Sequence, residues 1–261
     1  MVITKTPPKG IENLISEISK RCGVSAAFAK LLALRGIKSA EEAEKFIKPD
    51  KKNLYDPFLF TGMKEAVSRI ETAKVNGETV VVYGDYDADG ISATTIMYRG
   101  LVSYGIETYA VVPERENGYG LTAGVLERVL EEYCPDLIIT VDCGISAYSE
   151  IEELKDLGVD VIVTDHHEIP YEEEPLAGLD PETGERSRRR YIIPPADVVI
   201  DPKQPGDTYP FQEICGAVVA FKLMQLLFAE FGFDGISTDL TSGKRSLLDE
   251  LLEFAAFATI C

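Results

Sequence analysis

The chain of 261 residues carries 44 acidic side chains against 26 basic ones, which gives a formal net charge of -18. This balance argues against a protein that grips nucleic acid through a general basic surface, and it is compatible with carboxylates clustered around bound cations. The apolar content of 45% is typical of a globular protein, and no stretch approaches the roughly 20 apolar residues that span a bilayer.

The cysteines indicate a reducing compartment. There are five of them, they are scattered, and no two form a CxxC pair. An odd and unclustered set argues against a disulfide framework and against a thiolate zinc site. The start of the chain, MVITKTPPKG, has no apolar segment of the kind found in a secretory signal. We therefore expect a cytoplasmic protein that does not enter a membrane.

Residues 1–60 are predicted to form an N-terminal helical arm. Apolar side chains recur at helical spacing between residues 11 and 34. Ser39 followed by Glu42 has the pattern of a capping box, which would open a further helix through Ile47. A helix over residues 63–75, ending near Gly77, then leads into the rest of the chain.

From residue 79 onward, short apolar segments alternate with amphipathic ones. We expect strands at 79–83, 108–112, 137–141, 159–164 and 198–200, and helices at 90–104, 122–133, 147–157, 215–231 and 246–258. This alternation predicts an α/β fold, a Rossmann-like parallel sheet flanked by helices. The stretch 171–195 breaks the rhythm, because acids are followed there by RSRRR, and we interpret it as a solvated insertion loop with exposed charges.

Three of the predicted strands run directly into acids or histidines, and these include the only two histidines of the chain. The residues are Asp85, Asp87 and Asp89 after VVVYG, Asp142 after IITV, and Asp165, His166 and His167 after VIVT. The carboxyl ends of parallel strands lie along one edge of a sheet, where ligands bind. We therefore expect five acids and both histidines to converge at that edge.

Each of these groups also has a simpler interpretation. DYDADG matches the start of a calcium EF-hand loop, but Ile96 stands at the twelfth position, which needs a bidentate glutamate. An ordinary turn would explain Asp89-Gly90 but not three alternating acids. Asp142 alone could cap a helix, and His166 alone could be a core histidine. Divalent cations explain the set better, because uncompensated carboxylates on one edge would repel one another.

The composition of the set indicates which ions would bind. Carboxylate oxygens with imidazole favour Mn²⁺ or Mg²⁺ over a cysteine-rich zinc site. The alternating acids of DYDADG can reach two ions, and Asp142 on the neighbouring strand could bridge them. Sites that hold two ions about 3.5–4 Å apart serve in-line displacement at phosphorus.

Together these stretches resemble a known family. GDYDADG, VDCG and TDHH are similar to the first three motifs of the DHH phosphoesterases. LLALRGIKSAEEAEKFIKP, PERENGYGL and DPKQPGDTYPFQEICGAVVAFKL resemble its RecJ-type branch, the single-stranded-DNA-specific 5′→3′ exonucleases of DNA repair and recombination. The resemblance covers nearly the whole chain from about residue 30. It implies phosphodiester hydrolysis with a pair of Mn²⁺ or Mg²⁺ ions, single-stranded DNA as substrate, and a single-strand-binding protein and a helicase as partners.

The resemblance also implies roles for single residues. The implied metal ligands are Asp85, Asp87, Asp89, Asp142 and His166. His167 would act at the scissile phosphate, and Asp165 would support the histidines. Arg115, in PERENGYG, matches a basic position near the substrate phosphate, although a surface loop arginine is an equally simple interpretation.

One departure from the family concerns the end of the sequence. The family has a further metal-binding aspartate after a sequence like ATIC, and here Cys261 is the last residue. We therefore interpret residues 61–261 as a DHH domain that stops before the fourth motif and lacks the DHHA1 and OB-fold domains, and we expect this chain alone to be weak or inactive. Two alternatives stay open: a DHH phosphodiesterase for short oligonucleotides or cyclic dinucleotides, and an inactive DHH scaffold of a replication complex.

Overall fold

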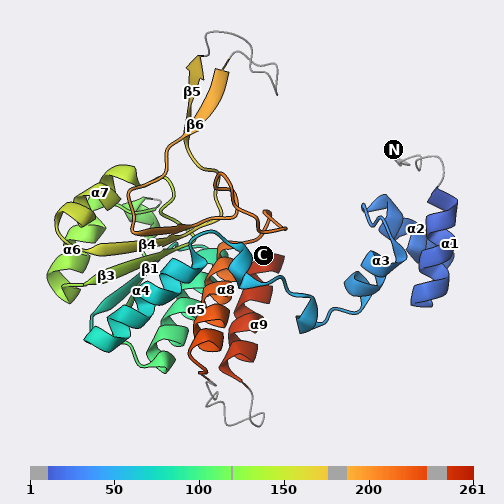
Figure 1. Cartoon of the computed structure of the whole chain (residues 1–261), viewed down its shortest axis with the longest axis horizontal. Helices are drawn as coiled ribbons and strands as arrows, with labels where there is room; N and C mark the ends of the chain where they lie inside the picture. The colour runs from blue at the N-terminus through green and yellow to red at the C-terminus, as the bar shows by residue number, and fades with distance from the viewer. Residues whose placement is uncertain (1–10, 119, 176–186, 234–245) are drawn as a thin grey trace. The chain divides into compact units, whose positions relative to one another are not determined.

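The computed structural model describes residues 11–118, 120–175, 187–233 and 246–261, and the chain divides into two compact units, Met1–Tyr55 and Asp56–Cys261 (Figure 1). The first unit contains the helices α1 (Ile11–Cys22), α2 (Ala26–Leu34) and α3 (Ala40–Ile47). They enclose a small core of their own around Ile18 and Leu32. Ser39 caps α3 as predicted, since its hydroxyl accepts the N–H of Glu42 at 3.0 Å.

The second unit is built on a parallel sheet with the strand order β2-β1-β3-β4-β7. The strands are β1 (Val80–Gly84), β2 (Thr108–Val111), β3 (Leu137–Val141), β4 (Asp160–Thr164) and β7 (Val198–Ile200). The chain passes from β1 to β2 on one side and then returns to β3 on the other side of β1. The strand order therefore reverses between β1 and β3, and in such sheets ligands bind at the carboxyl ends of the strands at that point.

Helices cover both faces of this sheet (Figure 1). The first face carries α4 (Met63–Asn76), α5 (Ala88–Tyr104), α8 (Gly216–Glu230) and α9 (Leu247–Ile260), and the second carries α6 (Ala123–Tyr133) and α7 (Tyr148–Asp156). Alternate residues of β1 serve the two cores, because Val80 and Val82 pack in the first and Val81 and Tyr83 in the second. The predicted α/β fold is confirmed.

The expected elements match the observed ones closely. Their ends differ by two residues at most, which is the usual uncertainty of a helix or strand boundary. Short 3₁₀ turns add η1 (Lys51–Asn53), η2 (Pro57–Leu59) and η3 (Arg115–Asn117). Within the described part of the chain, every helix is too short or too polar to span a lipid bilayer.

The prediction of a plain loop at 171–195 was wrong for the residues that the structure describes. β5 (Tyr171–Pro175) and β6 (Ser187–Tyr191) form an antiparallel ribbon, and residues 176–186 lie outside the described part. Three glutamates stand opposite three arginines across this ribbon. Arg190 donates to Glu172 at 2.6 Å and Arg188 to Glu174 at 3.0 Å. The acidic run of β5 and the basic run of β6 therefore form cross-strand pairs. The arginines are exposed, as expected.

Candidate metal centre

Four neighbouring strands of the sheet are each followed directly by an aspartate. In the register of the sheet, Gly84 pairs with Val141, Val141 with Thr164, and Thr164 with Ile200. The next residue on each strand therefore lies at the same level, and these residues are Asp85, Asp142, Asp165 and Asp201. Parallel pairing thus converts four distant sequence positions into one row of carboxylates beside the point where the strand order reverses.

The turn after β1 holds the first aspartates of DYDADG. Asp85 is buried, and its Oδ1 accepts the N–H of Tyr86 at 2.7 Å. Burial raises the pKa of Asp85 above its ordinary value. Asp87 caps α5, since its Oδ1 accepts the N–H groups of Asp89 and Gly90 at 2.8 and 2.9 Å. A Cβ at Gly90 would lie 2.5 Å from the carbonyl oxygen of Asp85, so only glycine allows this tight turn.

Asp142 occupies the centre of the site. It has a φ of 58°, which is uncommon for a residue with a side chain, and it is 2% exposed. Burial raises its pKa to about 6. Its buried Oδ1 lies 3.0 Å from Nε2 of His166, and this contact lowers the pKa of Asp142 against the larger effect of burial. A carboxylate oxygen and an imidazole nitrogen that lie this close inside the protein are placed as two ligands of one cation would be.

Among the described residues, two groups of three side chains bring their donor atoms within 4.8 Å of one another. The first consists of Asp85, Asp87 and Asp142, and the second of Asp142, His166 and His167. Asp142 belongs to both groups, which is the placement that a bridging ligand requires. One group offers three carboxylates and the other one carboxylate with two imidazoles, donors that suit Mn²⁺ or Mg²⁺, so the residues present fit a pair of such ions.

Asp165 holds both histidines in place through hydrogen bonds. Its Oδ1 accepts the N–H of His166 at 2.7 Å and lies 2.7 Å from Nδ1 of His167, and its Oδ2 accepts the N–H of Ile145 at 3.0 Å. Burial opposes the charge, but these donors hold the pKa of Asp165 below its ordinary value. The bond to Asp165 raises the pKa of His167 to about 9. A cationic imidazole fixed in this way suits a negatively charged phosphoryl group.

Asp89 lies beside the site but belongs to neither of the two donor groups found among the described residues. Its Oδ2 is 3.5 Å from Nε2 of His166. Its two oxygens accept the N–H groups of Gly216 and Ala217, each at 2.8 Å, at the start of α8. The structure therefore gives the third carboxylate of DYDADG a partner that its spacing in the motif does not reveal.

Arg115 lies over the same turn. It is exposed in η3, and its guanidinium carbon is 5.3 Å from the ring centroid of Tyr86, the second residue of DYDADG. The arginine is thus near the candidate metal centre. Its contact with a substrate phosphate stays a prediction.

Asp201 and Lys203 were not predicted from the sequence. Asp201 is fully buried; its Oδ1 accepts the N–H of Lys203 at 2.8 Å, and its Oδ2 has no hydrogen-bond partner. Burial raises the pKa of Asp201 to about 7. Nζ of Lys203 pairs with Glu168, next to His167, at 3.0 Å. The signal was present in the sequence, because DPK follows the expected strand 198–200 directly, as acids follow the other three strands.

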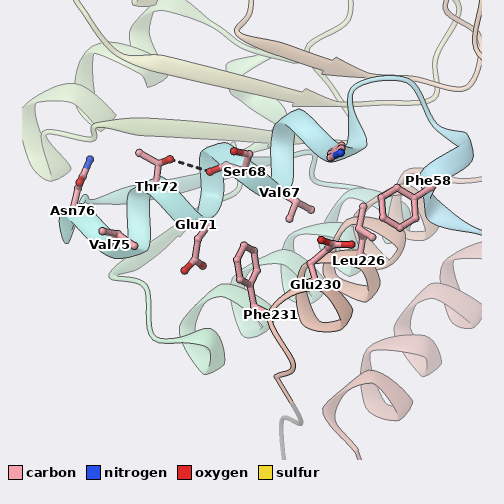
Figure 2. Close-up of a pocket in the computed structure, with 11 residues that line it drawn as sticks. Phe58, Val67, Ser68, Glu71, Thr72, Val75, Asn76, Leu226, Glu230 and Phe231 are labelled. Atoms are coloured by element: carbon pink, nitrogen blue, oxygen red, sulfur yellow. Dashed lines mark hydrogen bonds between the residues drawn. The ribbon is translucent and has the colours of Figure 1, made fainter.

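A cavity of about 420 Å³ lies elsewhere, between α4 and α8 (Figure 2). Phe58, Val67, Leu226 and Phe231 form its apolar part, and Glu71 and Glu230 add carboxylates. Leu226 comes ten residues after the start of α8 at Gly216, which corresponds to about 15 Å along the helix. None of the four strand-end aspartates lines this cavity. The chemistry therefore belongs to the sheet edge and not to this cavity.

Comparison with known proteins gives the family. The sequence pattern of the DHH family, N-terminal domain, matches residues 79–259. The chain belongs to the DHH family. The matched region contains the whole sheet and all four strand-end aspartates, so the DHH domain and the candidate metal centre coincide.

Relatives of this DHH chain include two proteins described as single-stranded-DNA-specific exonuclease RecJ. The one from Bacillus subtilis (strain 168) is 36% identical over 250 residues, which cover 95% of this chain and 27% of the relative. The one from Escherichia coli (strain K12) is 32% identical over 233 residues, which cover 88% of this chain and 36% of the relative. The chain thus spans only about a quarter to a third of the length of these proteins.

Solved structures of RecJ proteins have a similar fold. RecJ from Thermus thermophilus in complex with Mn²⁺ is 29% identical with a TM-score of 0.65, and the match covers 95% of this chain and 30% of that one. An exonuclease RecJ bound to manganese is 34% identical with a TM-score of 0.57, and the match covers 77% of this chain and 43% of that one. Both structures carry the ion that the donor atoms of this DHH domain suit.

Proposed function

We propose that this DHH domain is the catalytic part of a single-stranded-DNA-specific 5′→3′ exonuclease that acts with Mn²⁺ or Mg²⁺ in DNA repair and recombination. One observation carries the proposal: the buried Oδ1 of Asp142 lies 3.0 Å from Nε2 of His166, and Asp142 belongs to both groups of donor atoms, in the middle of an in-register row of aspartates. The names of the relatives supply the substrate class, since they are exonucleases specific for single-stranded DNA.

The residues of the site have different roles. Asp85, Asp87, Asp142 and His166 would hold the cations, which when bound supply Lewis-acid activation of the phosphodiester and offset the charge on its oxygens. His167, held by Asp165 at 2.7 Å, donates to the phosphoryl group and stabilises the negative charge that develops there. Arg115 and Lys203 are the cationic side chains at the margin of the site that would position the DNA backbone.

Because this chain is negatively charged, it can bind single-stranded DNA only through a local contact. A net charge of -18 repels a polyanion at long range, so binding must depend on cations bound at the sheet edge and on a few basic side chains. A single-strand-binding protein and a helicase are the partners that we propose. The cytoplasm is the proposed location, and five free cysteines support it.

The two ends of β3 provide a matched test. Asp142→Asn removes a charge at the carboxyl end of the strand, while Asp136→Asn makes the same change beyond the amino end, where the side chain accepts the N–H of Thr79 at 2.8 Å. The assay uses single-stranded oligonucleotides with a 5′ or a 3′ label in Mn²⁺, together with Mn²⁺ titration calorimetry. We expect Asp142→Asn to lower hydrolysis and Mn²⁺ affinity at least about 100-fold. Asp136→Asn should leave both unchanged.

The same assay separates the alternatives. Release of mononucleotides from the 5′ end supports the proposal, and release from the 3′ end contradicts it. Hydrolysis restricted to dinucleotides or cyclic dinucleotides would assign the chain to the other branch of DHH phosphodiesterases. Absence of Mn²⁺ binding by the full-length protein would identify an inactive scaffold.

A further inference from the structure

We propose that Asp89, the third carboxylate of DYDADG, is a positioning residue that anchors the first turn of α8 against the metal centre and is not itself a metal ligand. The consequence for metal binding rests on the proposed function. The anchoring itself rests only on the contacts of the folded chain. Asp89 would act on the centre through Gly216 and Asp142.

The start of α8 needs a carboxylate from elsewhere in the chain. The first N–H groups of a helix have no partner within the helix, and the residue before it commonly supplies a side-chain acceptor. Here that residue is Cys215, whose side chain makes no such bond. Asp89, which is 127 residues earlier than Gly216, supplies both acceptors, with Oδ2 bound to Gly216 and Oδ1 to Ala217, each at 2.8 Å.

The negative charge of Asp89 strengthens these two hydrogen bonds. Bonds from N–H groups to a carboxylate are stronger than neutral ones, and the start of a helix carries a partial positive charge that favours an anion. Because each oxygen already accepts one N–H in the first turn, the carboxylate is fixed in orientation. Only 16% of the side chain is exposed, so solvent weakens the interaction little.

Asp89 also differs from the other aspartates of its motif in what surrounds it. Asp85 and Asp87 form a group with Asp142 whose donor atoms lie within 4.8 Å of one another, and Asp89 belongs to no such group among the described residues. Its Oδ2 lies 3.5 Å from Nε2 of His166. The motif therefore contains two potential ligands and one residue with a different partner.

The anchored helix forms a wall of the centre. A Cβ added at Gly216 would lie 2.6 Å from Oδ1 of Asp142, closer than real Cβ atoms approach other atoms. The glycine thus gives space for the carboxylate that carries the site. Since Asp89 holds Gly216, and Gly216 leaves free the space beside Asp142, the position of the first turn of α8 fixes the room available to Asp142 and to a cation beside it.

The first test is hydrogen exchange of the backbone amides in the metal-free protein. Asp89→Asn keeps the size of the side chain but replaces one acceptor by a donor. We expect the amides of Gly216 and Ala217 to exchange at least about tenfold faster in this variant. The control is Asp136→Asn, the same substitution at the opposite end of the sheet, where the side chain accepts the N–H of Thr79, and it should leave the two amides of α8 unchanged. Unchanged exchange in Asp89→Asn would overturn the proposal.

The second test is Mn²⁺ titration of Asp89→Asn, Gly216→Ala and the double variant. If both residues act through one wall, each substitution weakens Mn²⁺ binding about tenfold, the number of bound ions is unchanged, and the double variant is no weaker than the weaker single variant. Loss of one bound ion in Asp89→Asn would show that Asp89 is a ligand, and multiplication of the two effects would show that it does not act through Gly216; either result contradicts the proposal. The exchange measurement needs no glycine variant, so it stands even if Gly216→Ala does not fold.

The two tests also separate this inference from the proposed function. A wild-type protein without Mn²⁺ affinity contradicts the proposed function, while faster exchange at Gly216 and Ala217 in Asp89→Asn still supports the anchor. Normal Mn²⁺ affinity with unchanged exchange contradicts the anchor and leaves the proposed function in place.

Discussion

Asp201→Asn should change how the stability of the metal-free protein depends on pH. The wild-type carboxyl is fully buried, its Oδ2 has no hydrogen-bond partner, and burial raises its pKa from 3.8 to about 7. Between these two values the folded chain binds a proton that the unfolded chain has lost. Stability therefore falls as pH rises through this window, and it levels off above pH 7.

The magnitude follows from the same pKa. Within this window the free energy of unfolding falls by about 1.4 kcal/mol for each pH unit. Through Asp201 alone, the wild type should therefore lose up to about 3 kcal/mol of stability between pH 5 and pH 8. Asparagine cannot titrate. Its Oδ1 can still accept the N–H of Lys203, but its amide group is a buried donor without a partner, which costs about 1–3 kcal/mol at every pH. The variant should be less stable than the wild type at pH 5 and as stable or more stable at pH 8.

The assay is urea unfolding followed by circular dichroism at several pH values between 5 and 8, in the presence of a chelator. The matched control is Asp160→Asn at the other end of the sheet. Burial opposes the charge of Asp160, but Lys155 and Arg69 hold its pKa below the ordinary value, so that substitution should cost stability throughout this range. A constant difference between wild type and Asp201→Asn at all pH values would refute the reasoning.

Gly84 and Asp165 give two further predictions. Gly84→Ala places a Cβ 1.8 Å from Oγ1 of Thr94 and should lower the free energy of unfolding by about 1–3 kcal/mol or prevent folding. Gly124→Ala is the control, because the space there is open, and it should leave the free energy of unfolding unchanged or raise it by up to about 1 kcal/mol. Thermal denaturation of the two variants compares them directly. Asp165→Asn removes the partner that raises the pKa of His167 to about 9, so the pKa of His167 should fall toward 6.5. An NMR titration of the ring protons in the metal-free protein measures this pKa, and a value still near 9 would contradict the assigned cause.

The elements of the second unit could be predicted because the signals are local. The apolar runs of β1 and β3 are buried at every residue, and buried strands read as continuous apolar segments. Glycine and helix-capping residues marked several ends, such as Gly77 after α4. The β5–β6 ribbon was not predicted, because its strands consist of charged residues whose pairing lies between distant positions and not in any local pattern.

The candidate site was predictable to the extent that it follows from strand ends. Asp85, Asp142 and His166 converge because parallel strands end at one edge, and the sequence contains those strands. Asp201 follows the same rule, but β7 has three residues and offers a weak signal. The partner of Asp89 could not be found in this way, since motif spacing does not reveal a helix start more than a hundred residues later.

The level row of aspartates makes the candidate metal centre depend on the pairing of the sheet itself. Because the side chains of a strand alternate between faces, a slip of one residue in β3 would carry Asp142 about 3.3 Å along the strand and turn its carboxylate to the opposite face. Insertions in the loops at the amino ends of these strands leave the row intact, whereas a single inserted residue within β1, β3 or β4 would separate the carboxylates without removing any of them. Variation in length within this family should therefore be confined to the connections, and the strands should keep their number of residues.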